Sequence, residues 1–194
     1  YSGKPPVRTP LLDGTMGEDW HEGALAATKA DPVQPINLYI QVDQGNLYLG
    51  LDLVPGEGQA LVVFIDTDFG AGTGFDTFSS IPAPTEQPLD QALSASFEVD
   101  LPGFGADVAI GTVAGAQVVG GGAIDAGARR LLAAGPQPMN GTVLANIEDG
   151  QLEMAITWQD LVPDTPLISQ VMAVLVVAVD LETATSPWQI PYTG

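Results

Sequence analysis

The sequence predicts an all-β fold, an antiparallel β-sandwich of the jelly-roll or immunoglobulin-like two-sheet kind, with one short helix at most. Short runs of β-branched and aromatic residues recur along the 194-residue chain. Between them lie 23 glycines and 16 prolines, and such frequent turn signals favour a sandwich or barrel over alternating strands and helices. Convincing helical periodicity is scarce.

The clearest local pattern is a β-hairpin. Ile36 to Val42 (INLYIQV) and Leu47 to Val54 (LYLGLDLV) have strand character, and the turn residues Asp43 to Asn46 separate them. The next segment, Ala60 to Ile65 (ALVVFI), predicts a core strand. Further strands are predicted at Ser94–Val99, Ala106–Val113, Gln117–Val119, Val143–Ile147, Leu152–Trp158 and Met172–Val179.

The longest apolar run, Val171 to Val179, is too short to span a bilayer and predicts a strand buried on both faces. The one short helix is expected at Asp125 to Ala134, with Asp125 as its N-cap and Gly135 after its end. A single helical turn is expected at Gln159 to Leu161 and a loop at Pro82 to Pro88.

The chain divides into an extended N-terminal arm, residues 1–11, and one sandwich domain, residues 12–194. Prolines fix an extended path in the arm. Either the arm is a frayed terminus, or it lies along a sheet edge of its own or a neighbouring copy. In the second case the subunit interface consists of Pro6, Val7, Arg8 and Thr9.

The chain is strongly acidic, with 24 acidic and 5 basic residues and a net charge of −19. Nucleic acid and anionic membrane surfaces are therefore poor partners, and cations are the natural counter-ions. Cysteine is absent, which excludes thiolate chemistry and disulfides. The sequence starts with Tyr1, so either a signal peptide has been removed or the sequence is an excised portion; we expect a secreted or cell-surface protein.

The segment from Asp66 to Asp76 (DTDFGAGTGFD) is the part of the sequence whose residue types best suit a ligand-binding site. Two carboxylates two residues apart, followed by glycines, can surround a hard cation with oxygen ligands. We hypothesise a Ca²⁺ site formed by Asp66, Asp68 and Asp76. The alternative is a solvated acidic turn after a strand.

Several stretches resemble the DOMON-like and family-9 carbohydrate-binding-module-like β-sandwiches. These stretches are Leu12–Trp20 (LDGTMGEDW), the Ile36–Val54 hairpin, Val62–Phe75 (VFIDTDFGAGTGF) and Leu152–Leu161 (LEMAITWQDL). The resemblance implies a sandwich with Trp20 and Trp158 in its core. Its members bind different ligands, so the fold alone does not assign a function. Haem is not expected, because the sole histidine, His21, has no methionine at a diagnostic spacing.

Two functions remain open. The first is a non-catalytic extracellular subunit that assembles with other copies of itself into an adhesive surface or filament. The second is a carbohydrate-binding module that takes polysaccharide through Trp188 and Tyr192, since sugar rings stack on aromatic faces. No enzyme activity is expected, because no nucleophile–base pair can be recognised.

Overall fold

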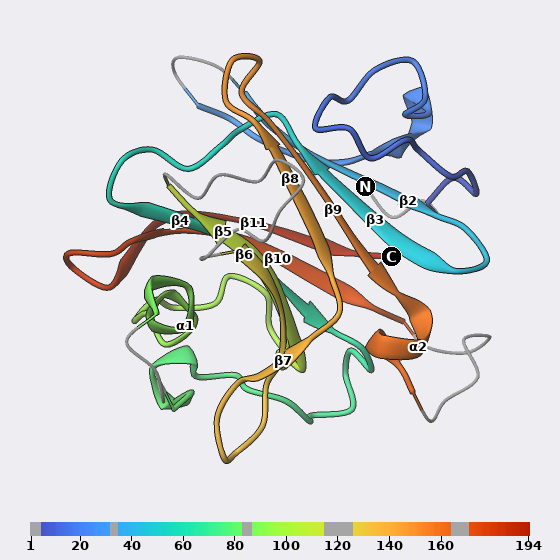
Figure 1. Cartoon of the computed structure of the whole chain (residues 1–194). Coiled ribbons are helices and arrows are strands. Elements are labelled where there is room, and N and C mark those ends of the chain that lie inside the picture. Colours follow the sequence, from blue (N-terminus) through green and yellow to red (C-terminus); the bar gives the residue numbers. More distant parts are fainter. Residues whose placement is uncertain (1–4, 32–34, 83–86, 115–125, 164–170) are drawn as a thin grey trace.

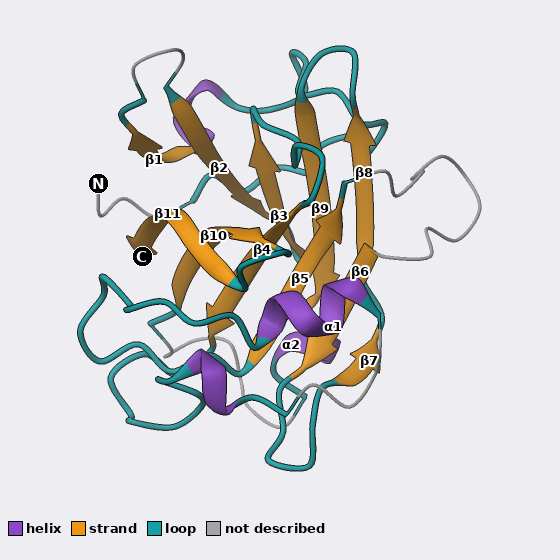
Figure 2. Ribbon diagram, turned by 90° about the vertical axis from the view of Figure 1, so that its left-hand side faces the viewer, coloured by secondary structure: helices purple, strands orange, loops and turns teal. Residues whose placement is uncertain are grey.

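The fold is the predicted antiparallel β-sandwich. A computed structural model describes residues 5–31, 35–82, 87–114, 126–163 and 171–194. It shows two antiparallel sheets packed face to face (Figures 1 and 2). The five-stranded sheet has the order β1 (Leu25–Lys29), β2 (Ile36–Val42), β3 (Asn46–Leu51), β9 (Gln151–Thr157), β8 (Thr142–Asn146). The six-stranded sheet has the order β11 (Thr185–Thr193), β10 (Ala173–Asp180), β4 (Gln59–Asp66), β5 (Val108–Val113), β6 (Ala126–Arg130), β7 (Gln137–Met139).

Alternate residues of each strand fill the core between the sheets, as the two-residue period of a strand requires. Leu38 and Leu49 point inward from the five-stranded sheet, and Val63 and Val176 meet them from the six-stranded sheet; all four are fully buried. At the borders of the sheets β1 lies against β11, and β8 lies near β6 (Figure 2).

A second apolar layer covers the outer face of the six-stranded sheet. Phe64 on β4 packs with Phe78, Leu89 and Phe104 from the segments that follow β4. These segments include the short helices η2 (Phe78–Ser80) and α1 (Pro88–Leu93), and α1 contacts β4 and β5. Because β4 and β10 are buried on both faces, their sequences are continuous apolar runs, and this prediction is confirmed for β10.

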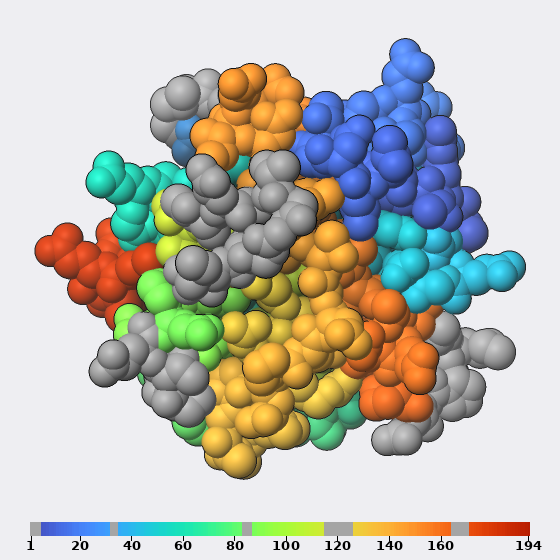
Figure 3. Space-filling view, viewed as in Figure 1, coloured from blue at the N-terminus to red at the C-terminus, as the bar shows by residue number. Residues whose placement is uncertain are grey.

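The N-terminal segment, residues 11–24, covers the outer face of the five-stranded sheet and ends in η1 (Glu22–Ala24). Its atoms, in dark blue, gather over one corner of the molecule in Figure 3. Glu153 of β9 is fully buried below it. The Glu153 carboxylate accepts hydrogen bonds from the backbone N–H of Asp13 (2.9 Å) and Gly14 (2.6 Å) and from Trp20 Nε1 (2.7 Å). Glu153 therefore joins two stretches, Leu12–Trp20 and Leu152–Leu161, that the sequence could not connect.

The helix predicted at Asp125 to Ala134 is wrong. Ala126–Arg130 forms β6, which pairs with β5 and β7. Ala128 is fully buried in the core between the sheets, so sheet pairing overrides the local helical preference. The α-helices of the described residues are both short and lie elsewhere. They are α1 (Pro88–Leu93) and α2 (Trp158–Leu161), the latter where a single turn was predicted.

Other predictions differ in detail. Ser94 to Val99 is not a strand, and Ser96 makes only an isolated bridge to Thr185. The predicted strand Gln117 to Val119 lies outside the described residues. Strands β1, β7 and β11 were not predicted. Within the described part of the chain, no helix is long and apolar enough to cross a membrane.

Candidate functional site

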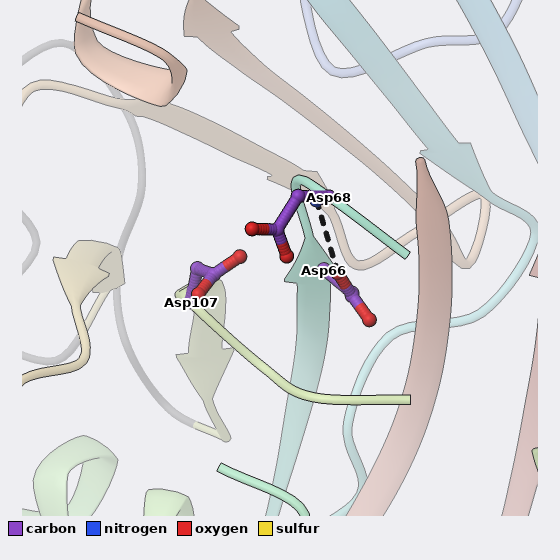
Figure 4. Close-up of side chains that lie close together, drawn as sticks. All are labelled: Asp66, Asp68 and Asp107. Atoms are coloured by element: carbon purple, nitrogen blue, oxygen red, sulfur yellow. Dashed lines mark hydrogen bonds between the residues drawn. The ribbon is translucent and has the colours of Figure 1, made fainter. Parts of the chain in front are cut away.

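Three carboxylates gather where β4 ends and β5 begins (Figure 4). Asp66 is the last residue of β4, Asp68 follows it, and Asp107 immediately precedes β5. One carboxylate oxygen from each of the three residues lies within 4.8 Å of the other two. A hard cation could bind between oxygens at this spacing.

Strand pairing brings these residues together. Ile65 of β4 lies opposite Val108 of β5, so the end of one strand meets the start of the other. Asp107 N–H donates to Ile65 O (3.0 Å). The backbone N–H and the hydroxyl of Thr67 both donate to Asp107 Oδ2, at 2.9 and 2.7 Å. Asp107 is thus fixed beside the segment that carries Asp66 and Asp68.

The glycine-rich loop after Asp68 folds back onto the segment before β5. Phe75 and Ala106 exchange two backbone hydrogen bonds of 2.9 Å. Gly105 is required by this close approach, because a Cβ atom there would lie 1.8 Å from the Thr73 carbonyl oxygen. The glycines therefore serve loop packing, which brings the Gly105 N–H within 2.8 Å of Asp66 Oδ2.

The electrostatics of the group are unfavourable without a cation. Asp66 is only 2% exposed. Burial raises the pKa of Asp66, hydrogen bonds from Gly105 and Asp68 oppose this, and the charges of Asp107 and Asp68 raise it further. Within the described part of the chain, no ion pair involves any of the three carboxylates. A bound cation would offset this repulsion and favour the ionised form of Asp66.

Asp76, the third ligand expected from the sequence, does not belong to this group. Its side chain is exposed, and Asp76 Oδ1 accepts a hydrogen bond from the Thr77 hydroxyl (3.2 Å). Asp107 was missed because it lies far from Asp68 in the sequence. The signal that could have indicated Asp107 is its position directly before β5, the strand that pairs with β4.

The two aromatic residues expected to bind sugar line separate cavities. Trp188 is half-buried on β11 and lines a cavity of about 490 Å³ together with Asp31, Asp52, Gln59 and Asp149. Tyr192 is 7% exposed and lines a different cavity, of about 300 Å³. Because Trp188 and Tyr192 line different cavities among the described residues, they do not form one stacking platform.

The arm lies on the chain's own sheet. Pro6 O accepts a hydrogen bond from Val42 N–H (3.1 Å), and Arg8 N–H donates to Val42 O (2.8 Å). The Thr9 hydroxyl donates to Asp43 (2.6 Å). The arm therefore adds a short parallel bridge to β2, beyond the residues of β2 that pair with β1. The Val7 side chain is 79% exposed.

Comparison with known proteins adds no family. No protein family's sequence profile matches the chain, and no curated protein matches it with significant similarity.

Proposed function

We propose that this chain is a non-catalytic extracellular β-sandwich, a structural or adhesive subunit that assembles with copies of itself and holds Ca²⁺ at Asp66, Asp68 and Asp107. The observation that carries the proposal is the group of three carboxylates, of which one is buried, at the junction of β4 and β5. Calcium suits this group because it takes several oxygen ligands in flexible geometry, and carbonyl groups or water can complete the shell.

Calcium at this site would act mainly on rigidity. It would bind the end of β4, the start of β5 and the first residues of the glycine-rich loop to one centre. Since the chain carries a net charge of −19, a divalent cation would also reduce self-repulsion between copies. Both effects favour an assembled state in a calcium-containing medium.

The free edge of the five-stranded sheet supports assembly with a second copy. Strand β1 pairs with β2 on one side, and on the other side it lies beside β11, with a groove of about 650 Å³ lined by residues of both strands. Leu25 of β1 is 40% exposed at this groove. On the β11 side, Pro187 and Pro191 have no N–H to donate, which protects that edge. A strand from a second copy would therefore pair with β1, not with β11.

Isothermal titration calorimetry with Ca²⁺ tests the metal site. We expect saturable binding that Asp107→Asn weakens by at least about tenfold, a change of about 1.4 kcal/mol in binding free energy. Asp76→Asn is the matched control, because it removes the same charge outside the group and should bind as the wild type does. Absence of calcium uptake, or equal weakening by both variants, would refute the site.

Sedimentation velocity and negative-stain electron microscopy test assembly, with calcium and with a chelator. We expect oligomers or fibres with calcium, and their loss in Leu25→Lys, which places a charge at the β1 edge. Leu132→Lys is the control, since Leu132 is similarly exposed (43%) and lies outside the β1 edge. A monomer at high concentration in both conditions would exclude self-assembly.

A carbohydrate-binding module is the second candidate, and the cavity at Trp188 favours it. An indole beside three carboxylates and one amide, in about 490 Å³, combines a stacking surface with hydrogen-bonding groups. Affinity electrophoresis on neutral polysaccharides would show retardation that Trp188→Phe reduces and Tyr192→Phe does not. Equal mobility on every polysaccharide and on a sugar-free gel would refute this candidate.

A further inference from the structure

A cavity of about 300 Å³ opens at one end of the sandwich, between the inner faces of the two sheets. In Figure 1 this is the right-hand end, where α2 and the C-terminal end of β11 lie. The five-stranded sheet forms one wall and the six-stranded sheet the other. The strand residues that line it are Ile40, Val42, Leu47, Val174 and Tyr192.

The cavity exists because the core is not filled at this end. Two residues further in along each strand, the space between the sheets is closed by the fully buried side chains of Leu38, Leu49 and Val176. At the end, Val42, Trp158, Val162 and Met172 line the cavity and are only half-buried. Apolar side chains that face a partly enclosed space gain free energy when a ligand removes them from water.

The polar groups of the wall are already engaged within the protein. Among the described residues that line the cavity, Asp43 is the one with a charged side chain. Its Oδ1 accepts from the N–H groups of Gly45 and Asn46, both at 2.7 Å. Its Oδ2 accepts from the hydroxyls of Thr9 (2.6 Å) and Tyr48 (2.7 Å). These bonds fix the β2–β3 turn and leave the carboxylate little capacity to bind a ligand.

The ionisation of Asp43 and the position of the Trp158 ring are fixed in the same way. Burial alone would raise the pKa of Asp43, but its hydrogen bonds outweigh burial and lower the pKa to about 2. Trp158 Nε1 donates to the Asp43 backbone oxygen (2.8 Å), which holds the indole at the wall. A ligand here would meet fixed apolar and aromatic surfaces beside a permanent negative charge.

From these features we infer that the cavity binds a neutral, largely apolar small molecule, with Trp158, Val162, Met172 and Tyr192 as its contacts. A cavity of about 150 Å³ lined by apolar residues holds benzene. One of about 300 Å³ accommodates two or three fused or linked rings, or an aliphatic chain of similar size. Anionic amphiphiles are disfavoured by Asp43 and by the net charge of −19. This site is independent of the calcium group and of assembly.

A fluorescence titration with the neutral probe N-phenyl-1-naphthylamine tests the site on the whole chain. We expect saturable enhancement, and a loss of affinity of at least about tenfold in Val162→Trp, whose indole would fill the cavity. Leu132→Trp adds the same indole at an exposed position outside this cavity and should leave the affinity unchanged. The anionic probe 8-anilinonaphthalene-1-sulfonate should bind more weakly than the neutral one.

Methionine methyl NMR locates the probe without depending on the folding of a variant. Met172 lies in the cavity wall, whereas Met139 lies on β7 in the other part of the six-stranded sheet. Ring currents from the naphthyl group should shift the Met172 methyl signal and leave that of Met139 in place. Met172→Leu assigns the signal.

The inference is overturned if the neutral probe shows no saturable binding, or if Leu132→Trp weakens it as much as Val162→Trp does. An unmoved Met172 signal at saturating probe, or a shift of equal size at Met139, also overturns it. Equal or tighter binding of the anionic probe would refute the selectivity for neutral ligands.

Discussion

The buried carboxylate of Glu153 should decide whether the N-terminal segment stays on the sheet. Replacing it by leucine removes the acceptor for three donors, of which Gly14 N–H and Trp20 Nε1 are buried. The apolar side chain cannot replace those hydrogen bonds. We therefore expect residues 11–24 to detach from the outer face of the five-stranded sheet more readily than in the wild type.

The magnitude follows from the two buried donors. Leaving a buried donor without a partner costs about 1–3 kcal/mol, so two cost roughly 2–6 kcal/mol. The leucine variant no longer has to bury a carboxylate, which returns part of this cost. We expect a net loss of about 2–4 kcal/mol, or about 5–15 °C in Tm for a chain of this length. Glu153→Gln keeps one carbonyl oxygen and should lose about half as much.

Differential scanning calorimetry and urea denaturation measure these changes, and tryptophan fluorescence reports the exposure of Trp20. Glu18→Gln is the control, since Glu18 is exposed on the same segment and the change removes the same charge. If Glu153→Leu unfolds within about 0.5 kcal/mol of the wild type, the value of a neutral surface substitution, the reasoning fails.

Two further predictions concern pH and loop packing. Burial raises the pKa of Glu153 above its ordinary value of 4.5, more than the hydrogen bonds from Trp20, Gly14 and Asp13 lower it. The folded state then binds the proton more tightly than the unfolded state does. The contribution of Glu153 to stability is therefore largest below about pH 4.5 and falls as the pH rises through the raised pKa of the folded state. Urea denaturation between about pH 4 and about pH 7 should show a shallower fall for Glu153→Gln, and an unchanged slope would contradict this. Gly105→Ala should destabilise by about 1–3 kcal/mol and weaken calcium binding, because its Cβ would meet the loop backbone. Gly17→Ala is the control, because Gly17 has room for a Cβ; measured by the same calorimetry, it should leave the stability nearly unchanged.

The strands that the sequence predicted are those with strong local signals. Val62, Phe64 and Val177 lie in apolar runs of β4 and β10, which are buried on both faces and could be recognised without any partner. Strand β11 was missed because Pro187 and Pro191 are typical of loops. An edge strand tolerates proline, since one side of its backbone makes no ladder bonds, and edge position is not visible in a linear sequence.

The candidate metal site was predicted only in part, because only part of it is a local pattern in the sequence. Asp66 and Asp68 stand two residues apart after a core strand, which is a local pattern. Asp107 joins them only because β4 and β5 pair in one register. Asp76 was the natural choice in the sequence, but the loop folds so that its side chain points into solvent.

By itself the sequence determined the fold class, the acidic surface and the position of the first carboxylate pair. These depend on composition, on two-residue periodicity and on residues that are neighbours in the chain. Only the tertiary structure decided which distant residues meet: Glu153 with Trp20, Asp107 with Asp66, and Trp158 with Tyr192 across one cavity. The physical reason is that strand register and sheet packing set these contacts, and both are chosen by burial of the whole core and not by any local segment.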